Sequence, residues 1–176
     1  MPQTAIFTTG IGWIRWLKGL VTPGSGTGLS VIEQGAPTRA VHKVTVTYAA
    51  LAAAAVTADK TIATLPAKTR LVSIIADTTT KYIGGAVTAA TLIVGKSAGG
   101  NEYIVSHDVF TAAVTKGLAD ADLGTSITRA GAIQGGDLPS WTATTAVTVR
   151  LTTTTANTNA LTQGSTTYYL VTETMP

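Results

Sequence analysis

Hydrophobic and polar residues alternate along several short stretches of this 176-residue chain. In residues 40–48 (AVHKVTVTY) and 144–155 (TTAVTVRLTTTT), valine or leucine at every second position alternates with threonine or a basic residue. Residues 166–174 (TTYYLVTET) have the length and the β-branched and aromatic content of a strand, with apolar residues on both faces. A period of two is typical of β-strands, so the sequence predicts a strand in each stretch.

Residues 61–105 contain three further runs of strand length, separated by turn-forming residues. These runs are residues 70–79 (RLVSIIADTT), 91–96 (TLIVGK) and 101–106 (NEYIVS). A polar, glycine-containing break, residues 81–90 (KYIGGAVTAA), lies between the first two. Both faces of the 70–79 run are largely apolar, which predicts an interior strand of a sandwich or one that a neighbouring subunit covers.

Two other parts of the chain have a less regular pattern. Residues 50–61 (ALAAAAVTADKT) are rich in alanine, which favours helix on propensity, but the run is short and lies among strands. Two alternatives stay open there, a strand of small residues or one helical turn. Residues 106–141 contain five glycines and only short apolar runs, so we expect one or two short strands with long loops.

Taken together, these elements predict an all-β fold. About eight strands and no long helix indicate a two-sheet antiparallel sandwich of jelly-roll type, which we assign to residues 39–176. Threonine makes up about a fifth of the chain, and charged residues only 12%. Because threonine keeps an exposed sheet face polar without charge, such faces suit packing against other copies or another protein.

Residues 1–38 differ from the rest and are predicted to form an extended or short-helical arm with a glycine-rich linker, residues 23–28 (PGSGTG). At helical spacing, one apolar face of the arm carries two of the chain's three tryptophans. The candidate partner-binding residues of the arm are Trp13, Ile14, Trp16, Leu17 and Leu20.

Two roles for this arm stay open. It either covers the open end of the sandwich or docks as an anchor on a neighbouring protein, because tryptophan and arginine are enriched in interface cores. A helix on a membrane surface is disfavoured, since the basic face of the arm is thin.

Gly95-Lys96-Ser97 has the ending of a phosphate-binding P-loop, but the residues before it do not fit. The motif requires glycine where this chain has Ala90, and residues 91–94 form a strand run where an open loop is needed. We therefore predict that Lys96 directly precedes a hairpin turn and that no nucleotide is bound.

Ser106-His107-Asp108 places three residue types of a catalytic triad in a row. Neighbours on a strand point to opposite faces, so they cannot form a relay, and we interpret His107 as a loop or surface histidine. With His42 as the other histidine and no cysteine, a metal site is not expected. Asp120–Gly124 resembles the start of a calcium loop but lacks its closing glutamate, and a turn is favoured. The chain is predicted to be no enzyme and to need no cofactor.

Charge and hydropathy exclude further classes of protein. The net charge is +3 and the 12 basic residues are scattered, so the electrostatic footprint of a nucleic-acid binder is missing. The N-terminal residues lack the pattern of a signal peptide, and the longest apolar run, Ala49–Val56, is too short to span a bilayer. We expect neither nucleic acid nor a membrane as a partner.

One series of runs resembles a known group of proteins. The series is Leu65-Pro66-Ala67, Arg70–Asp77, Leu92–Gly95, Asn101–Ile104 and the late run TAVTVRLT at 145–152. It is similar to a pattern in small virion proteins of tailed bacteriophages. The resemblance implies a jelly-roll or related sandwich, often trimeric, that decorates or cements the capsid or belongs to a head or tail fibre.

From this resemblance we expect a structural virion protein that binds the outer capsid surface as a decoration or cement protein. Its partners would be the major capsid protein or another virion protein, and other copies of itself, with a trimer as the expected oligomer. It would be made in the host cytoplasm and located in the virion, at the capsid surface. The alternatives are a tail- or fibre-associated virion protein, or a carbohydrate- or receptor-binding sandwich whose site lies in loops 106–141.

Overall fold

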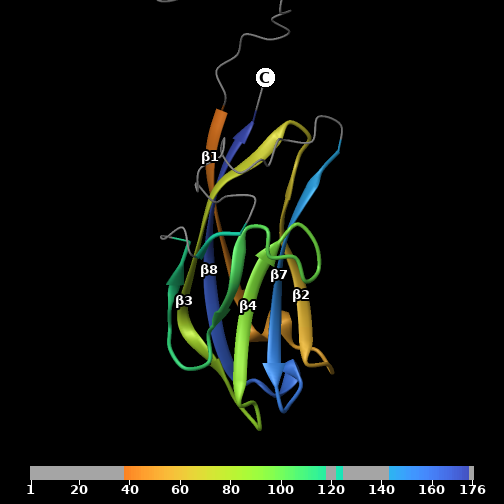
Figure 1. Cartoon of the computed structure of the whole chain (residues 1–176), viewed down its shortest axis with the longest axis vertical. Helices are drawn as coiled ribbons and strands as arrows, with labels where there is room; N and C mark the ends of the chain where they lie inside the picture. Colours follow the sequence, from red (N-terminus) through yellow and green to blue (C-terminus); the bar gives the residue numbers. More distant parts are fainter. Residues whose placement is uncertain (1–37, 118–121, 125–142, 175–176) are drawn as a thin grey trace, which may run out of the picture. The chain divides into compact units, whose positions relative to one another are not determined.

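The computed structural model describes residues 38–117, 122–124 and 143–174, which form two layers of β-strands (Figure 1). The strands are β1 (Thr38–Thr47), β2 (Thr57–Leu65), β3 (Thr69–Ile83), β4 (Ala89–Gly95), β5 (Ile104–Asp108), β6 (Thr115–Lys116), β7 (Thr145–Thr154) and β8 (Gln163–Thr174). The 3₁₀ turns η1 (Tyr48–Leu51) and η3 (Thr158–Ala160) lie between β1 and β2 and between β7 and β8. In this described part of the chain, no helix is long and apolar enough to cross a membrane.

The strands form two antiparallel sheets of four strands each. Sheet A has the order β1-β8-β3-β6, and sheet B has the order β2-β7-β4-β5. β1 pairs with β8, β2 with β7, β3 with β6 and β4 with β5. The eight strands are therefore arranged as one long hairpin whose two halves are rolled up together. Pairing of β3 with β8 and of β4 with β7 completes the sheets. This topology is the jelly roll, and it confirms the predicted two-sheet antiparallel sandwich.

The hydrophobic core lies between the two sheets. Every second residue of a strand points to the same face, and the inward side chains of Ile74, Leu92, Leu151 and Leu170 are completely buried. Burying one such side chain stabilises the fold by about 1.5–3 kcal/mol. The alternation that is visible in the sequence is therefore the alternation between this core and the two outer faces.

Tyrosine and threonine side chains form a polar group inside the core. Tyr82 Oη donates a hydrogen bond to the Val46 carbonyl oxygen at 3.1 Å, and the hydroxyls of Thr78 and Thr166 lie 3.0 Å apart. Burial raises the pKa of Tyr82, so its hydroxyl stays a neutral donor. The Tyr82 ring packs on Gly164, where φ is +151° and a Cβ atom would lie 2.3 Å from a ring carbon. Only glycine fits this position of β8 without strain.

The predicted break at residues 81–90 is wrong at both ends. β3 continues through Ile83, and β4 already begins at Ala89. Tyr82 continues the strand because its N–H donates to the Val109 carbonyl oxygen at 2.9 Å while its side chain enters the core. That hydrogen bond joins residues that are distant in sequence, so local patterning does not reveal it.

Residues 50–61 contain both structures that the sequence left open. The turn η1 is one helical turn that ends at the buried Leu51, and the strand β2 begins at Thr57. Residues 70–79 lie in a strand with neighbours on both sides, because β3 lies between β8 and β6 in sheet A. Its outward residues from Arg70 to Asp77 are half-buried, and the alternative that a neighbouring subunit covers this strand stays a prediction.

Candidate interaction surface

The residues predicted to form the N-terminal anchor lie outside the described residues. They are Trp13, Ile14, Trp16, Leu17 and Leu20. Their role in binding a partner therefore stays a prediction, as does the division of the chain into residues 1–38 and 39–176.

Gly95-Lys96-Ser97 lies where β4 ends and the hairpin to β5 begins, which confirms the predicted turn. The carboxylate of Glu102 accepts a hydrogen bond from the Lys96 N–H at 3.0 Å. This hydrogen bond closes the turn that joins β4 to β5. Because Glu102 belongs to this turn, the strand predicted at residues 101–106 is wrong at its start and begins only at Ile104.

Ser106-His107-Asp108 ends β5, and its side chains alternate as predicted: Ser106 and Asp108 are exposed and His107 is buried. The predicted loop or surface position of His107 is wrong, because the residue lies opposite Leu92 in the pairing of β4 with β5. Burial lowers the pKa of His107, which keeps the imidazole neutral at pH 7. Asp108 Oδ1 accepts a hydrogen bond from the Phe110 N–H at 2.7 Å, so it stabilises the following turn and does not orient the histidine.

The structure describes residues 122–124 of the predicted turn Asp120–Gly124. Asp122 Oδ1 forms an ion pair with Lys116 Nζ at 2.9 Å. The Gly124 N–H donates to the Tyr103 carbonyl oxygen at 2.9 Å, which fastens this segment to the β4–β5 hairpin. A lysine thus neutralises the carboxylate that a calcium loop would need. Among residues 38–117, 122–124 and 143–174, no group of three or more His, Cys, Asp or Glu could hold a metal ion.

Each carboxylate in the described part of the chain accepts a hydrogen bond from the chain itself. The pairs are Asp59 with Arg150, Asp77 with Thr115, Glu102 with Lys96, Asp108 with Phe110, Asp122 with Lys116 and Glu173 with Arg70. These carboxylates join strands and close turns. The candidate interaction sites are therefore the outer faces of the two sheets, because the described carboxylates are already used within the chain.

The outer face of sheet A consists of rows in which residues of β1, β8 and β3 lie side by side. Successive rows are Arg39-Glu173-Arg70, Val41-Val171-Ser73, Lys43-Tyr169-Ile75 and Thr45-Thr167-Asp77. Cross-strand neighbours of this kind have Cβ atoms about 5 Å apart. The first three rows, which we name the basic–apolar face, therefore form one continuous surface.

Three cations border this face. Arg70 Nη2 lies 2.6 Å from Glu173 Oε2, and Arg39 Nε lies 3.2 Å from Glu173 Oε1. Hydrogen bonds from Arg70, and then from Arg39, lower the pKa of Glu173, but one carboxylate cannot neutralise two guanidinium groups. Lys43 Nζ lies 5.8 Å from the ring centre of Tyr169, a cation–π contact that leaves its positive charge at the surface.

The centre of the face is apolar. Among the described residues, the exposed large hydrophobic side chains are those of Val41, at 69%, and Val56, at 47%. Val41 lies beside Val171 on β8, and the half-buried Tyr169 and Ile75 lie in the next row. The result is an apolar area with positive charge on two sides.

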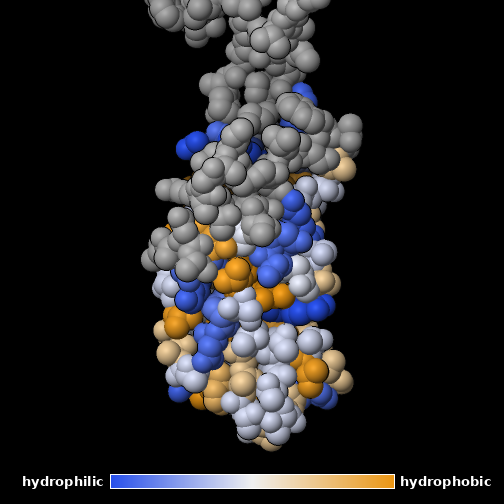
Figure 2. All heavy atoms as spheres, in the orientation of Figure 1, coloured by the Kyte–Doolittle hydropathy of each residue, from blue (hydrophilic) through white to orange (hydrophobic). Residues whose placement is uncertain are grey.

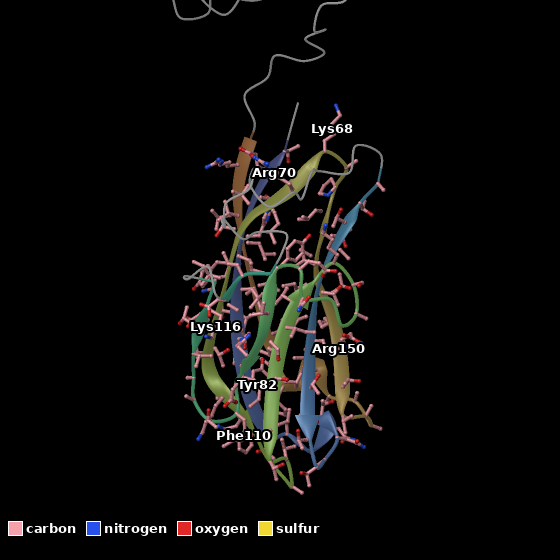
Figure 3. All side chains as sticks on the ribbon, viewed as in Figure 1. Lys68, Arg70, Tyr82, Phe110, Lys116 and Arg150 are labelled. Atoms are coloured by element: carbon pink, nitrogen blue, oxygen red, sulfur yellow. The ribbon has the colours of Figure 1, made fainter. Side chains whose placement is uncertain are left out.

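The outer face of sheet B has a different composition. Arg150 binds Asp59 through two hydrogen bonds of 2.8 Å, so its central charges cancel. The rows on either side are Thr57-Thr152-Thr91 and Thr61-Thr148-Gly95. Figure 2, in which β4 and β7 face the viewer, shows hydrophobic residues only in small groups between hydrophilic and neutral ones. In Figure 3, Arg150 lies along β7, whereas Arg70 lies near the end of the sandwich where β1 begins.

A cavity of about 270 Å³ opens between the ends of β1, β2 and β8. Its lining is apolar or hydroxyl-bearing and includes Ala40, Leu65, Pro66 and Thr172, with His42 Nε2 at 3.1 Å from the Thr172 hydroxyl. The sandwich thus has an open end, which the proposed covering role of the arm requires. That role stays a prediction.

Sequence reasoning did not identify the basic–apolar face, because its residues come from three strands whose pairing the sequence does not reveal. One signal was present. In residues 40–48 the outward positions Thr45 and Thr47 are polar, and Val41 is the apolar residue that shares their phase. A single exposed apolar residue is common on protein surfaces, and it points to a contact outside the core only together with apolar neighbours on the adjacent strands.

Comparison with known proteins assigns no family to this chain. No protein-family model matches it, and no curated protein matches it significantly. Among solved structures, it is similar to a chain of the cyanophage Pam1 capsid asymmetric unit, with a TM-score of 0.43 and 17% sequence identity, over 89% of this chain and 99% of that chain.

Proposed function

We propose that this protein is a non-enzymatic structural component of a tailed-phage virion and that it binds and stabilises the outer capsid surface. The observation that supports the proposal is the continuous basic–apolar face of sheet A. The described carboxylates, in contrast, accept hydrogen bonds within the chain and form no cluster for chemistry. Jelly rolls occur in viral capsid domains and also in lectins and cupins. That support is an analogy of fold. The sequence resemblance, which includes residues 65–77, 92–104 and 145–152, favours the virion among these.

The mechanism would be passive. A sheet face of valine, tyrosine and threonine can bury area against another protein without removing many charges from water. Each contact is modest, but copies that are linked as an oligomer bind together, and linkage increases the overall affinity without any new contact. We expect a trimer that bridges neighbouring capsid subunits.

The decisive experiment is to locate the protein on intact particles of the phage that encodes it, by cryo-electron microscopy with mass spectrometry of the purified particles. The proposal expects a density of the size of this jelly roll on the outer capsid surface, in many copies. Density on the tail or a fibre would replace the capsid role by a tail-associated one. Absence of the protein from particles would overturn the virion assignment.

The arm is tested separately by deleting residues 1–22. If Trp13, Trp16 and Leu17 anchor the protein, the truncated chain keeps its thermal unfolding transition but no longer sediments with emptied capsids. The full-length variant with Trp13→Ala and Trp16→Ala is the matched control for loss of chain length. Full occupancy by the truncated protein would show that the arm is no anchor.

A further inference from the structure

We propose that the basic–apolar face of sheet A is the surface that contacts the partner in the particle, and that the contacting surface of the partner carries acidic side chains around an apolar centre. This inference rests on the proposed function and specifies it. It names the face, the residues and the chemistry of the protein that the face binds.

The charges of the face favour a partner that carries acidic side chains. Arg39, Lys43 and Arg70 contribute three positive charges, and Glu173, which is buried beneath the two arginines, contributes one negative charge. No carboxylate within the described residues pairs with Lys43. Acidic side chains opposite these cations would complete the charge balance and would orient the approach of the two proteins.

The apolar centre favours a partner whose contact removes it from water. Val41 has 69% of its surface exposed on a strand where threonine occupies the equivalent positions Thr45 and Thr47. Threonine keeps a strand as well as valine does, so strand formation does not explain valine at this site. A valine that lies beside Val171 and one row from Tyr169 provides the aliphatic and aromatic contact area typical of interface cores.

Other occupants fit the face less well. A second copy of the same face would bring Arg39, Lys43 and Arg70 against their own kind, and like charges that face each other disfavour association. Nucleic acid is bound mainly through phosphate contacts, and a face whose centre is Val41 and Val171 offers little to a phosphate. An acidic protein surface satisfies both the cations and the apolar centre.

The first test uses intact particles and a zero-length carbodiimide cross-linker, which joins a lysine amine to a carboxylate in direct contact. Lys43 on β1 is the probe, and Lys60, which is exposed on the edge strand β2, is the internal control. Mass spectrometry should find Lys43 joined to Asp or Glu of a different virion protein. Acetylation of Lys43 should be much lower than in the free protein, because a buried contact shields the amine from the reagent. Lys60 should keep its reactivity.

The second test measures binding of purified full-length variants to emptied capsids. Val41→Asp and Lys43→Glu should each reduce occupancy about tenfold at equal protein concentration. Val56→Asp and Lys60→Glu make the same chemical changes outside the face and should bind like the unchanged protein. Equal thermal unfolding of all four variants confirms that folding is intact.

Each outcome decides the question. If the protein is on particles but Lys43 reacts as it does in the free protein, the face is not the contact and only this inference is overturned. Three other results would overturn the acidic partner. A cross-link from Lys43 to another copy of this chain would indicate self-association, and protection of Lys43 without any cross-link would indicate a non-acidic protein surface. Protection of Lys43 that nuclease treatment removes would indicate nucleic acid. Absence of the protein from particles would overturn the proposed function together with the inference.

Discussion

The two outer faces of the sandwich are built on the same jelly-roll topology, yet they differ in how they use charge. On sheet B, Arg150 and Asp59 neutralise each other through two hydrogen bonds. The half-buried Ile93 lies opposite Arg150, and threonines with Gly95 make up the rows on either side. On sheet A, two arginines share the single carboxylate of Glu173, and exposed or half-buried apolar residues follow. Sheet B pairs its central charges internally, whereas sheet A leaves an excess of cations and an exposed valine at the surface, where they are available to a partner.

The largest loss of unfolding free energy should come from a substitution on the inner side of sheet A. It tests whether both outer faces depend on the same packed core. Gly164→Ala places a Cβ atom into the Tyr82 ring at a φ that alanine rarely adopts, so we expect a loss of about 3 kcal/mol of unfolding free energy. Urea denaturation measures it. In a Tyr82→Leu background the ring is gone, and the additional cost of Gly164→Ala should be smaller. Equal costs in both backgrounds would contradict the packing explanation.

Next in size is the contrast between the two ion-pair sites. The Glu173 side chain is 5% exposed and contacts two arginines, whereas the Asp59 side chain is 32% exposed and contacts one. Glu173→Gln should therefore cost about 1.5–3 kcal/mol, as for hydrogen bonds to a charged group. Asp59→Asn should cost less than about 1 kcal/mol, as for exposed pairs. Chemical denaturation of both variants at pH 7 measures the difference, and equal losses would remove the distinction between the faces.

Lowering the pH should weaken the contribution of Glu173 on sheet A to stability. The pKa of Glu173 is lowered in the folded state by hydrogen bonds from Arg70 and Arg39. Its contribution to stability is therefore present above the unfolded-state pKa of about 4.3 and is lost as the pH falls through the lower folded-state pKa. Glu173→Gln should show a shallower loss of stability than the unchanged protein over this acidic range. Parallel curves would show that Glu173 does not drive the acid sensitivity.

The smallest expected effect concerns the threonine rows. On sheet A the hydroxyls of Thr45 and Thr167 lie 3.0 Å apart, and on sheet B those of Thr61 and Thr148 lie 3.4 Å apart. A double-mutant cycle with valine should give a coupling energy of about 0.5 kcal/mol for the first pair and less for the second. A stronger coupling on sheet B would reverse this order and show that distance alone does not set it.

The fold could be predicted because the strands β1, β7 and β8 have clear strand patterns in the sequence. Residues 40–48 and 144–155 alternate, and residues 166–174 have the length and the β-branched and aromatic content of a strand; they correspond to β1, β7 and β8. The boundaries near Tyr82 and Glu102 could not be predicted, because each depends on one hydrogen bond to a residue in another element or across a turn. Local sequence contains the phase of a strand but not the partner that ends or extends it.

The candidate site could be predicted only in part. Tyr169 and Val171 are visible as apolar residues on the outward phase of the last strand, but their neighbours Val41 and Ile75 come from distant parts of the chain. The excess of positive charge is also invisible in sequence, because Arg39 and Arg70 meet at Glu173 only after β1, β8 and β3 pair. Strand pairing, more than composition, creates this surface.

The pairing of the first strand with the last has a mechanical consequence. Thr38 lies opposite Thr174, so a pulling force applied through these two positions acts at the same end of an antiparallel pair. Such a force opens the hydrogen bonds one after another, like a zipper, and does not load them all at once. A force transmitted through a tether at the start of β1 would thus separate β1 from β8 at low force. A contact spread across the face of the sheet would resist a higher force. Single-molecule pulling in these two geometries would measure the difference.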